Sequence, residues 1–381
     1  MRRIFVPLLL ALTLLLVGCG PTHIKTEAAG EDALDIVVTV FPAYDLARAA
    51  AGDLANVTLL LPPGAESHSY EPTPADILAV QECDLFIYLG GESDTWVETI
   101  LSSIDLQGDA MRMVDCVELL DEAHVEGMQN DPGHDHDHGH ETDCDDASHD
   151  HAAEEADDHD HETHIGEGHT PEEEAALHDQ HDHDEHDHEE PAETLDDHDH
   201  LLGAVIGKDE HVWTSPKNAA KIARDIGAKL AELDAINGAH YCANAEAYAL
   251  QLDALHEEFQ TFFDGLEHRT IVFGDRFPLQ YFAEEYDLDY YAAFPGCSTQ
   301  TEPSAATIAF LTDKVKAEEI SCIFYIEFSN HLVADSIAEA TDRQTALYHT
   351  CHNVSRQEIE AGETYLSLME RNLETLKACM K

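Results

Sequence analysis

The stretch Asp35-Ile36-Val37-Val38-Thr39-Val40-Phe41-Pro42 decides the fold class of this chain. Its β-branched run is continuous rather than alternating, which is typical of a strand covered on both faces in a parallel sheet. Pro42 then opens a helical stretch through Ala51, because a proline at a helix start lacks only an N–H that would have no partner there. A buried strand followed directly by a helix indicates an α/β fold.

The same alternation continues along the chain and predicts two (β/α) lobes with parallel sheets. The first lobe has further strands at 57–61, 84–89 and 112–114, and helices at 73–80, 95–101 and from Pro216. A long amphipathic stretch, 239–266, has Tyr248, Leu252, Leu255, Phe259 and Phe262 at helical spacing and predicts a helix joining the lobes. The second lobe has strands at 270–273, 289–292, 322–327 and 346–349, and helices at 279–286, 304–318, 332–341 and 363–380. Ligands of such sheets bind in the loops beyond the carboxyl ends of the strands, and His68 lies in such a loop.

An acidic, histidine-rich segment interrupts the first lobe. Seventeen of the 27 His lie between His134 and His200, almost all beside an Asp or Glu, and no Lys or Arg occurs between Arg112 and Lys208. So polar a segment buries too little apolar surface to offset its ordering entropy, and we expect it to be disordered without metal. Imidazoles beside carboxylates suit Zn²⁺ and similar divalent ions, so we interpret it as an auxiliary metal-collecting loop rather than a solvated linker. Its candidate ligands are His134, His136, His138, His140, His159, His161, His181, His183, His186, His188, His198 and His200.

The charge composition of the chain limits the molecules that it can bind electrostatically. The chain has 381 residues and a formal net charge of −60. That charge argues against nucleic acid and against electrostatic binding to anionic lipid, since both are negative, and it favours cationic ligands.

The first residues indicate export. Arg2 and Arg3 precede an apolar run, Ile4 to Val17, that is too short to span a bilayer comfortably. The run ends Leu16-Val17-Gly18-Cys19, which resembles the bacterial lipobox, so we expect Cys19 to be lipidated. The predicted location is the extracytoplasmic face of the cell membrane, with the protein held there by acyl chains.

The other eight Cys form no CxxC pair and no disulfide-scaffold spacing. Some can pair after export. Cys83 and Cys322 lie beside apolar, strand-like runs, which favours small core residues over disulfide partners.

Two motifs carry a resemblance to a known family. PPGAESHSYEPTPADI (62–77) and DEHVWTSPKNA (209–219) resemble the metal-binding lipoproteins that deliver ions to ABC importers, in particular the zinc-uptake solute-binding proteins. The resemblance implies two lobes bridged by a long rigid helix, with a metal in the cleft between them. It also implies that His68 and His211 are metal ligands, and that an acidic His-rich loop occurs in the zinc branch.

The second lobe departs from the family pattern. The family has a third ligand in a segment similar to F-H-D-A-F, whereas this chain reads Phe273-Gly274-Asp275-Arg276-Phe277. We therefore predict that Gly274 is no ligand, that Gly274→His could add one, and that Glu327 and His352 complete the site. Asp275 and His331 are the reserves, and pairing of Glu327 with Arg276 is the alternative role for that carboxylate.

The predicted organisation follows from these segments. It comprises a signal peptide 1–18, a lipidated Cys and tether 19–33, a first lobe 34–238 containing the His/Asp/Glu-rich loop 121–207, a linking helix 239–266 and a second lobe 267–381.

Three classes of function remain to be separated. The resemblance implies a non-catalytic binding protein that captures Zn²⁺ and delivers it to an ABC permease, and we expect it to be a monomer. An extracytoplasmic zinc buffer, or a manganese-binding member of the same family, are the alternatives. A zinc hydrolase is disfavoured because the chain contains no H-E-x-x-H and no G-x-S-x-G.

Overall fold

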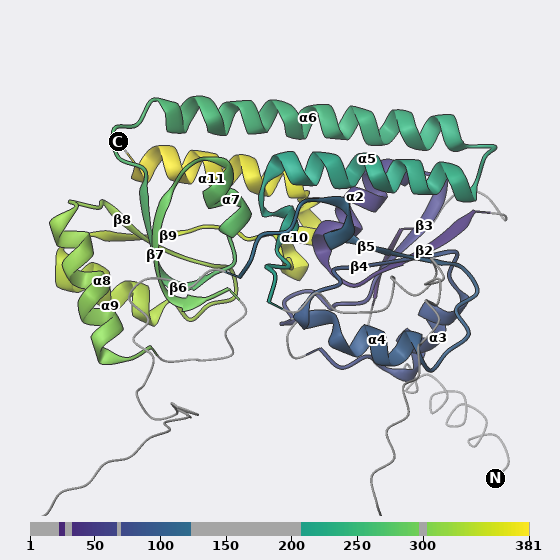
Figure 1. Ribbon diagram of the computed structural model, residues 1–381, viewed down its shortest axis with the longest axis horizontal. Coiled ribbons are helices and arrows are strands. Elements are labelled where there is room, and N and C mark those ends of the chain that lie inside the picture. The colour runs from purple at the N-terminus through teal and green to yellow at the C-terminus, as the bar shows by residue number, and fades with distance from the viewer. Residues whose placement is uncertain (1–22, 27–32, 67–69, 123–206, 297–302, 381) are drawn as a thin grey trace, which may run out of the picture. The chain divides into compact units, whose positions relative to one another are not determined.

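The chain folds into two β-sheets, each covered by helices, as Figure 1 shows. The computed structural model describes residues 23–26, 33–66, 70–122, 207–296 and 303–380. All of these residues belong to one compact unit. The predicted α/β class with two lobes is confirmed.

The first sheet has five strands in the order β1-β3-β2-β4-β5. Its strands are β1 (Ile24–Thr26), β2 (Leu34–Val38), β3 (Ala55–Leu59), β4 (Leu85–Tyr88) and β5 (Asp109–Arg112). Ile36 and Val38 pack into one core cluster while Val37 packs into another, so β2 is buried on both faces as its sequence predicts. All pairs in this sheet are parallel except β1 with β3.

The helices of the first lobe begin at recognisable signals. They are α2 (Phe41–Ala51), α3 (Pro74–Glu82), α4 (Thr95–Leu101) and α5 (Pro216–Leu233), with short 3-10 helices η2 (Glu92–Asp94), η3 (Met113–Cys116) and η4 (Val212–Thr214). Thr73 and Asp76 form a reciprocal capping box at the start of α3. Ser215 caps α5, and Pro216 occupies its first turn.

Two local expectations for the first lobe need correction. The strand expected at 112–114 ends at Arg112, and Met113–Cys116 is a 3-10 helix. The segment expected to be a tether contains β1, because Ile24–Thr26 pairs antiparallel with Val57–Leu59 at the edge of the sheet. Three residues are too short for their periodicity to reveal a strand.

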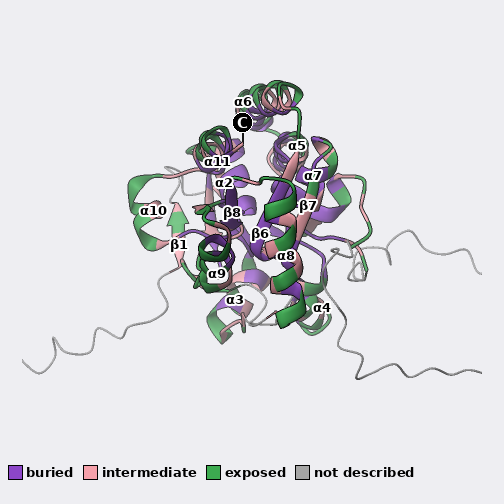
Figure 2. Cartoon of the chain, turned by 90° about the vertical axis from the view of Figure 1, so that its left-hand side faces the viewer, coloured by how far each residue is buried: buried purple, intermediate pink, exposed green. Residues whose placement is uncertain are grey.

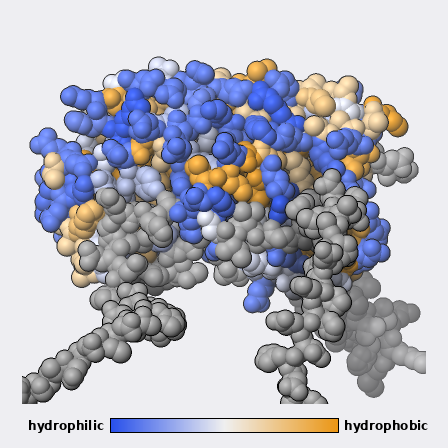
Figure 3. All heavy atoms as spheres, viewed as in Figure 1, coloured by the Kyte–Doolittle hydropathy of each residue, from blue (hydrophilic) through white to orange (hydrophobic). Residues whose placement is uncertain are grey.

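A single helix, α6 (Gly238–Asp264), connects the lobes. It packs on α5 and α2 of the first lobe and on α11 of the second. Leu252, Leu255, Phe259 and Phe263 form its buried side, whereas Figure 3 shows mainly hydrophilic side chains along its outer face. This division is the one expected for an amphipathic helix.

The second sheet has four parallel strands in the order β7-β6-β8-β9. They are β6 (Thr270–Phe277), β7 (Asp289–Pro295), β8 (Cys322–Tyr325) and β9 (Gln344–Leu347), with helices α7 (Gln280–Glu285), α8 (Ala305–Ala317), α9 (Leu332–Thr341), α10 (Arg356–Ala361) and α11 (Tyr365–Cys379). Figure 2 shows β6 and β8 buried beneath helices α8 and α9, whose outer faces are exposed. Helix α10 was not predicted because its six residues, RQEIEA, include no buried residue and hence no apolar stripe.

Both sheets repeat one topology. In each, the first long strand (β2 or β6) lies between the next two strands of the chain, so the connections leave it in opposite directions. Such a reversal opens a crevice at the carboxyl ends of the strands, which is where α/β sheets bind ligands.

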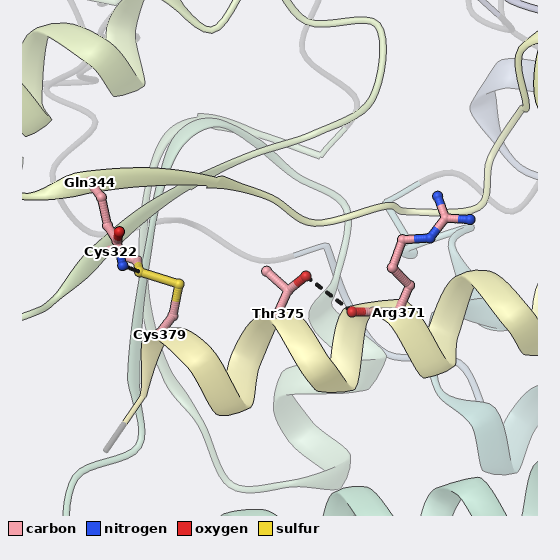
Figure 4. The surroundings of a disulfide bond; sticks show 5 residues. All are labelled: Cys322, Gln344, Arg371, Thr375 and Cys379. Carbon is pink, nitrogen blue, oxygen red and sulfur yellow. Dashed lines mark hydrogen bonds between the residues drawn. A yellow bond between two sulfur atoms is a disulfide. The ribbon is translucent and has the colours of Figure 1, made fainter.

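A disulfide ties the second sheet to the last helix. Cys322 at the start of β8 is bonded to Cys379 at the end of α11, with Cα atoms 5.5 Å apart (Figure 4). The interpretation of Cys322 as an unbonded core residue is therefore wrong, because tertiary packing brings α11 alongside β8. Cys83 is a buried, unbonded core cysteine, as expected.

No helix within the described ranges is both long and apolar enough to cross a membrane.

Candidate functional site

A small pocket lies at the carboxyl ends of strands from both lobes. Its polar lining consists of Glu66, His211, Arg276, Glu327, Thr350, His352 and Asn353. The cavity volume is about 30 Å³. Pockets for organic ligands measure hundreds of Å³, whereas a cavity needs only about 10–15 Å³ to hold one water molecule. The pocket therefore suits a single ion rather than an organic substrate.

His211 is held by its own chain segment. Its backbone N–H donates to Asp209 Oδ1 at 2.7 Å, and its Nδ1 lies 2.9 Å from the same oxygen. A carboxylate at Nδ1 favours the tautomer whose proton is on that nitrogen and whose lone pair is on Nε2. This is the arrangement in which a carboxylate orients a metal-binding imidazole.

The electrostatics of His211 favour positive charge. Burial lowers its pKa, but the carboxylate of Asp209, with Glu210 and Glu122, outweighs burial and raises the pKa above the ordinary value. The surroundings that stabilise an imidazolium also stabilise a bound cation.

His352 reaches the pocket from the second lobe, in the segment after β9. Its ring centroid lies 5.7 Å from that of His211, with the two rings nearly perpendicular. Trp213 packs against both imidazoles, with ring centroids 5.4 Å from His211 and 5.0 Å from His352. The Trp213 indole N–H also donates to Thr350 O at 2.9 Å, so one aromatic residue joins the two histidine-bearing segments.

Glu327 follows the end of β8 and lines the same pocket. Its carboxylate accepts hydrogen bonds from the backbone N–H of Thr350, at 2.8 Å, and from the Thr350 hydroxyl. His349 Nδ1 lies 3.8 Å from its Oε1. Arg276, the cation considered as the alternative partner of Glu327, donates its guanidinium hydrogen bonds to Glu66, while the charge of Glu327 contributes to raising the pKa of Arg276.

The reserve ligands do not line the pocket. Asp275 is buried and accepts backbone hydrogen bonds from Arg276 and Ile326. His331 is exposed at the start of α9, and its Nδ1 lies 2.8 Å from Asp335 Oδ2.

Gly274 is enclosed rather than directed at the pocket. A Cβ at this position would lie 2.4 Å from Ala334 Cα and 2.5 Å from Ala334 N, both in α9. The expectation that Gly274→His could add a ligand is therefore wrong, because no side chain fits between β6 and α9 there. Strand β6 shifts register against β7 between Phe273 and Arg276, a bulge that re-aims the residues which follow.

Several predicted residues lie outside the described residues. These are His68, Cys19 and every histidine of the His-rich loop. Two positions before His68, Glu66 lines the pocket, and Asn353 donates to Pro62 O and Ala65 O of the same loop at 2.8 Å. Within the described ranges, no three His, Cys, Asp or Glu side chains are grouped closely enough to hold a metal.

The ends of the His-rich loop meet beside His211. Glu122 N donates to Gly207 O at 3.1 Å and Asp209 N donates to Leu120 O at 3.0 Å. The chain thus leaves for the loop at Glu122 and returns from it at Gly207, four residues before the pocket histidine.

Five pocket or neighbouring residues were not recognised as site residues from the sequence: Glu66, Arg276, Thr350, Asn353 and Asp209. The Asp-x-His spacing of Asp209 and His211 is a signal that could have identified one of them, because it places a carboxylate within reach of Nδ1. The other four act through contacts between segments far apart in the chain, for which a single sequence holds no signal.

Comparison with known proteins identifies the family. The family model described as zinc-uptake complex component A, periplasmic, matches residues 36–379. The zinc-binding lipoprotein AdcA of Streptococcus pneumoniae is 27% identical over 99% of this chain, which spans 61% of that relative's length. The high-affinity zinc uptake system protein ZnuA of Bacillus subtilis is 26% identical over 96% of this chain and 93% of its own length.

Solved structures agree on the fold. The Zn(II)-bound ZnuA-like domain of Streptococcus pneumoniae AdcA aligns with a TM-score of 0.62 at 24% identity, over 91% of this chain and 99% of that one. The metal-dependent lipoprotein YcdH of Bacillus subtilis aligns with a TM-score of 0.63 at 22% identity, over 91% and 100%. A family match over almost the whole described fold, with a two-lobed architecture shared by these structures, leads to one conclusion: the chain belongs to the zinc-uptake complex component A family.

Proposed function

We propose that this protein is an extracytoplasmic solute-binding protein that captures Zn²⁺ and delivers it to the permease of an ABC importer. One observation carries the proposal. His211 from the first lobe and His352 from the second meet in a pocket of about 30 Å³. Two imidazoles supplied by different lobes fit a site that opens and closes as the lobes move apart and together.

The ligand set we propose is His68, His211, Glu327 and His352, whose three described members are not grouped closely enough to hold a metal in this structure and would converge on it as the lobes close. Three imidazoles and one carboxylate suit zinc, since nitrogen ligands favour Zn²⁺ and oxygen-dominated sites suit Mn²⁺. We include His68 in this set because it belongs to the motif PPGAESHSYEPTPADI and because it follows Glu66, which lines the pocket, by two residues in the sequence. The proposed role is non-catalytic. Its support is the transport family and a cavity of about 30 Å³, too small for a metal-bound organic substrate.

We infer the location from two features. The lipobox-like Leu16-Val17-Gly18-Cys19 supports a lipid anchor at Cys19. The Cys322–Cys379 disulfide suits an oxidising compartment outside the cytoplasm. The curated Streptococcus pneumoniae relative is itself named a lipoprotein. We propose that the protein acts there as a monomer.

The His-rich loop is proposed to collect metal for the pocket rather than to be the transport site. A transport ligand needs a packed shell that holds its orientation, as Asp209 holds His211. Loosely arrayed imidazoles pay ordering entropy at each binding event and bind more weakly, but their number raises the local metal concentration. The meeting of Glu122 with Gly207, the described residues on either side of the loop, supports this role.

The experiment measures zinc binding by calorimetry in a form lacking residues 133–200, which removes the weak loop sites. His211→Ala and His352→Ala should each weaken the tight site by more than the roughly 10- to 100-fold typical of losing an outer-shell partner. His331→Ala is the matched control, because His331 is exposed and outside the pocket lining. Unchanged affinity in both pocket variants would refute the assignment. A protein binding many weak equivalents and no tight one would instead be a zinc buffer.

A further inference from the structure

One ion pair crosses the pocket between the lobes. Arg276, at the end of β6, donates from its two terminal nitrogens to the two oxygens of Glu66, at 3.0 and 3.2 Å. Glu66 belongs to the loop after β3 of the other lobe. Such a two-pronged guanidinium–carboxylate pair is among the strongest and most directional of protein hydrogen-bonding arrangements.

Both members of this pair belong to the pocket. Arg276 and Glu66 line the cavity together with His211 and His352. The register shift in β6 between Phe273 and Arg276 explains why Arg276 faces the cavity while Gly274 faces α9. The carboxylate of Glu66 is thus an oxygen ligand within reach of the cavity whose two oxygens both accept hydrogen bonds from Arg276.

The hydrogen bonds that Arg276 donates to Glu66 change which metal ions the pocket favours. A bidentate carboxylate is a preferred ligand of Mn²⁺, whereas imidazoles favour Zn²⁺. A carboxylate whose two oxygens are both held by a guanidinium fork keeps other lone pairs, but it cannot chelate a cation with both oxygens while the fork occupies that side. The positive charge of Arg276 repels every divalent cation alike, so the charge itself does not discriminate between Zn²⁺ and Mn²⁺. By holding Glu66, however, Arg276 removes an oxygen ligand, and this loss disfavours Mn²⁺ more than Zn²⁺.

We propose that Arg276 is a specificity-determining residue that holds Glu66 away from the bound cation and thereby keeps the pocket selective for Zn²⁺ over Mn²⁺. This inference rests on the proposed function, because it assumes that the pocket at His211 and His352 binds the transported metal.

The test compares Zn²⁺ and Mn²⁺ affinities of the full chain carrying Arg276→Gln. Zinc binding is measured by competition with a chromophoric chelator, and Mn²⁺ binding by loss of the free-ion electron paramagnetic resonance signal. Removing the charge should strengthen binding of both metals, but the release of Glu66 should strengthen Mn²⁺ binding at least tenfold more. Adding Glu66→Gln to Arg276→Gln should restore the original ratio of the two affinities.

Two further variants complete the design. Arg276→Lys keeps the positive charge but replaces the fork with a point charge, so it should shift the ratio part of the way. Arg224→Gln is the matched control, since Arg224 on helix α5 forms a comparable double ion pair with Glu246 and Asp253, which both lie on helix α6.

The outcomes separate this inference from the proposed function. An unchanged affinity ratio in Arg276→Gln, or a shift that survives addition of Glu66→Gln, would overturn the specificity role while zinc binding by the wild type stands. A wild type whose zinc binding is insensitive to His211→Ala would overturn the proposed site itself. A shift of the same size in Arg224→Gln would show a general effect of charge and would also overturn the inference.

Discussion

Removal of the Cys322–Cys379 disulfide should destabilise the protein by an amount set by the length of chain that the bond closes. The two cysteines are separated by 57 residues in sequence. For a loop of that length, the lost restriction on the unfolded chain corresponds to about 4 kcal/mol at 25 °C. Both sulfurs lie in the core between β8 and α11 (Figure 4), so removing the bond leaves the folded arrangement largely in place.

The assay is urea unfolding of the double variant Cys322→Ala/Cys379→Ala. We expect the free energy of unfolding to fall by about 4 kcal/mol, since the effect acts mainly on the unfolded chain. The wild type measured with a thiol reductant should show a similar fall, and the double variant should not respond to the reductant. Cys242→Ala is the control, because Cys242 is exposed and unbonded.

A specific result would refute this reasoning. If the double variant loses less than about 1 kcal/mol, the bond does not restrict the unfolded chain as the loop length requires. If alkylation of the unfolded, unreduced wild type modifies Cys322 and Cys379, the bond does not form. Zinc affinity should be unchanged in the double variant, because neither sulfur lines the pocket.

Three further predictions address individual residues. Zinc affinity of the pocket should decline with falling pH from a point above the ordinary imidazole pKa of about 6.5, since the pKa of His211 is raised. Asp209→Asn should move that decline to lower pH, and calorimetry across pH that shows no movement would contradict the role of Asp209. Burial and the nearby Glu210 raise the pKa of Asp94 in the folded protein to about 7. The contribution of Asp94 to the free energy of unfolding is therefore fully present below the pKa that Asp94 has in the unfolded chain, and it is lost as pH rises through about 7. Asp94→Asn should therefore flatten the pH dependence of urea unfolding between roughly pH 4 and 8, and an unchanged profile would count against it. Gly274→Ala should destabilise the fold by about 2 kcal/mol, because the added Cβ would be overpacked against α9. Thermal unfolding measures this loss, and an unchanged stability would show that α9 can shift to accommodate the methyl group.

Much of the architecture could be predicted because it depends on local patterns. The continuous run at Ile36–Val40 and the apolar spacing of Leu252, Leu255 and Phe259 each reflect burial on a definite face. The places where the predictions failed are short. Ile24–Thr26 forms a strand only because β3 offers it an unpaired edge, and α10 has no buried residue from which a periodicity could arise.

In the candidate site, too, some residues could be predicted from the sequence and some contacts could not. His211 and His352 could be proposed from the sequence, and the structure brings their rings to 5.7 Å from one another. The pairing of Arg276 with Glu66, rather than with Glu327, could not be foreseen, because the partners are 210 residues apart and belong to different lobes. Likewise, nothing in the sequence around Gly274 shows that Ala334 closes that position.

The sequence by itself determined the α/β class, the linking helix and the chemistry of an imidazole-rich, acidic metal binder, because strand burial, helix periodicity and ligand type are properties of the residues themselves. Tertiary structure decided which of those residues share the pocket, which carboxylate Arg276 engages, and that Cys322 meets Cys379. These are distances between segments far apart in the chain, and they exist only once both sheets and their helices have packed together.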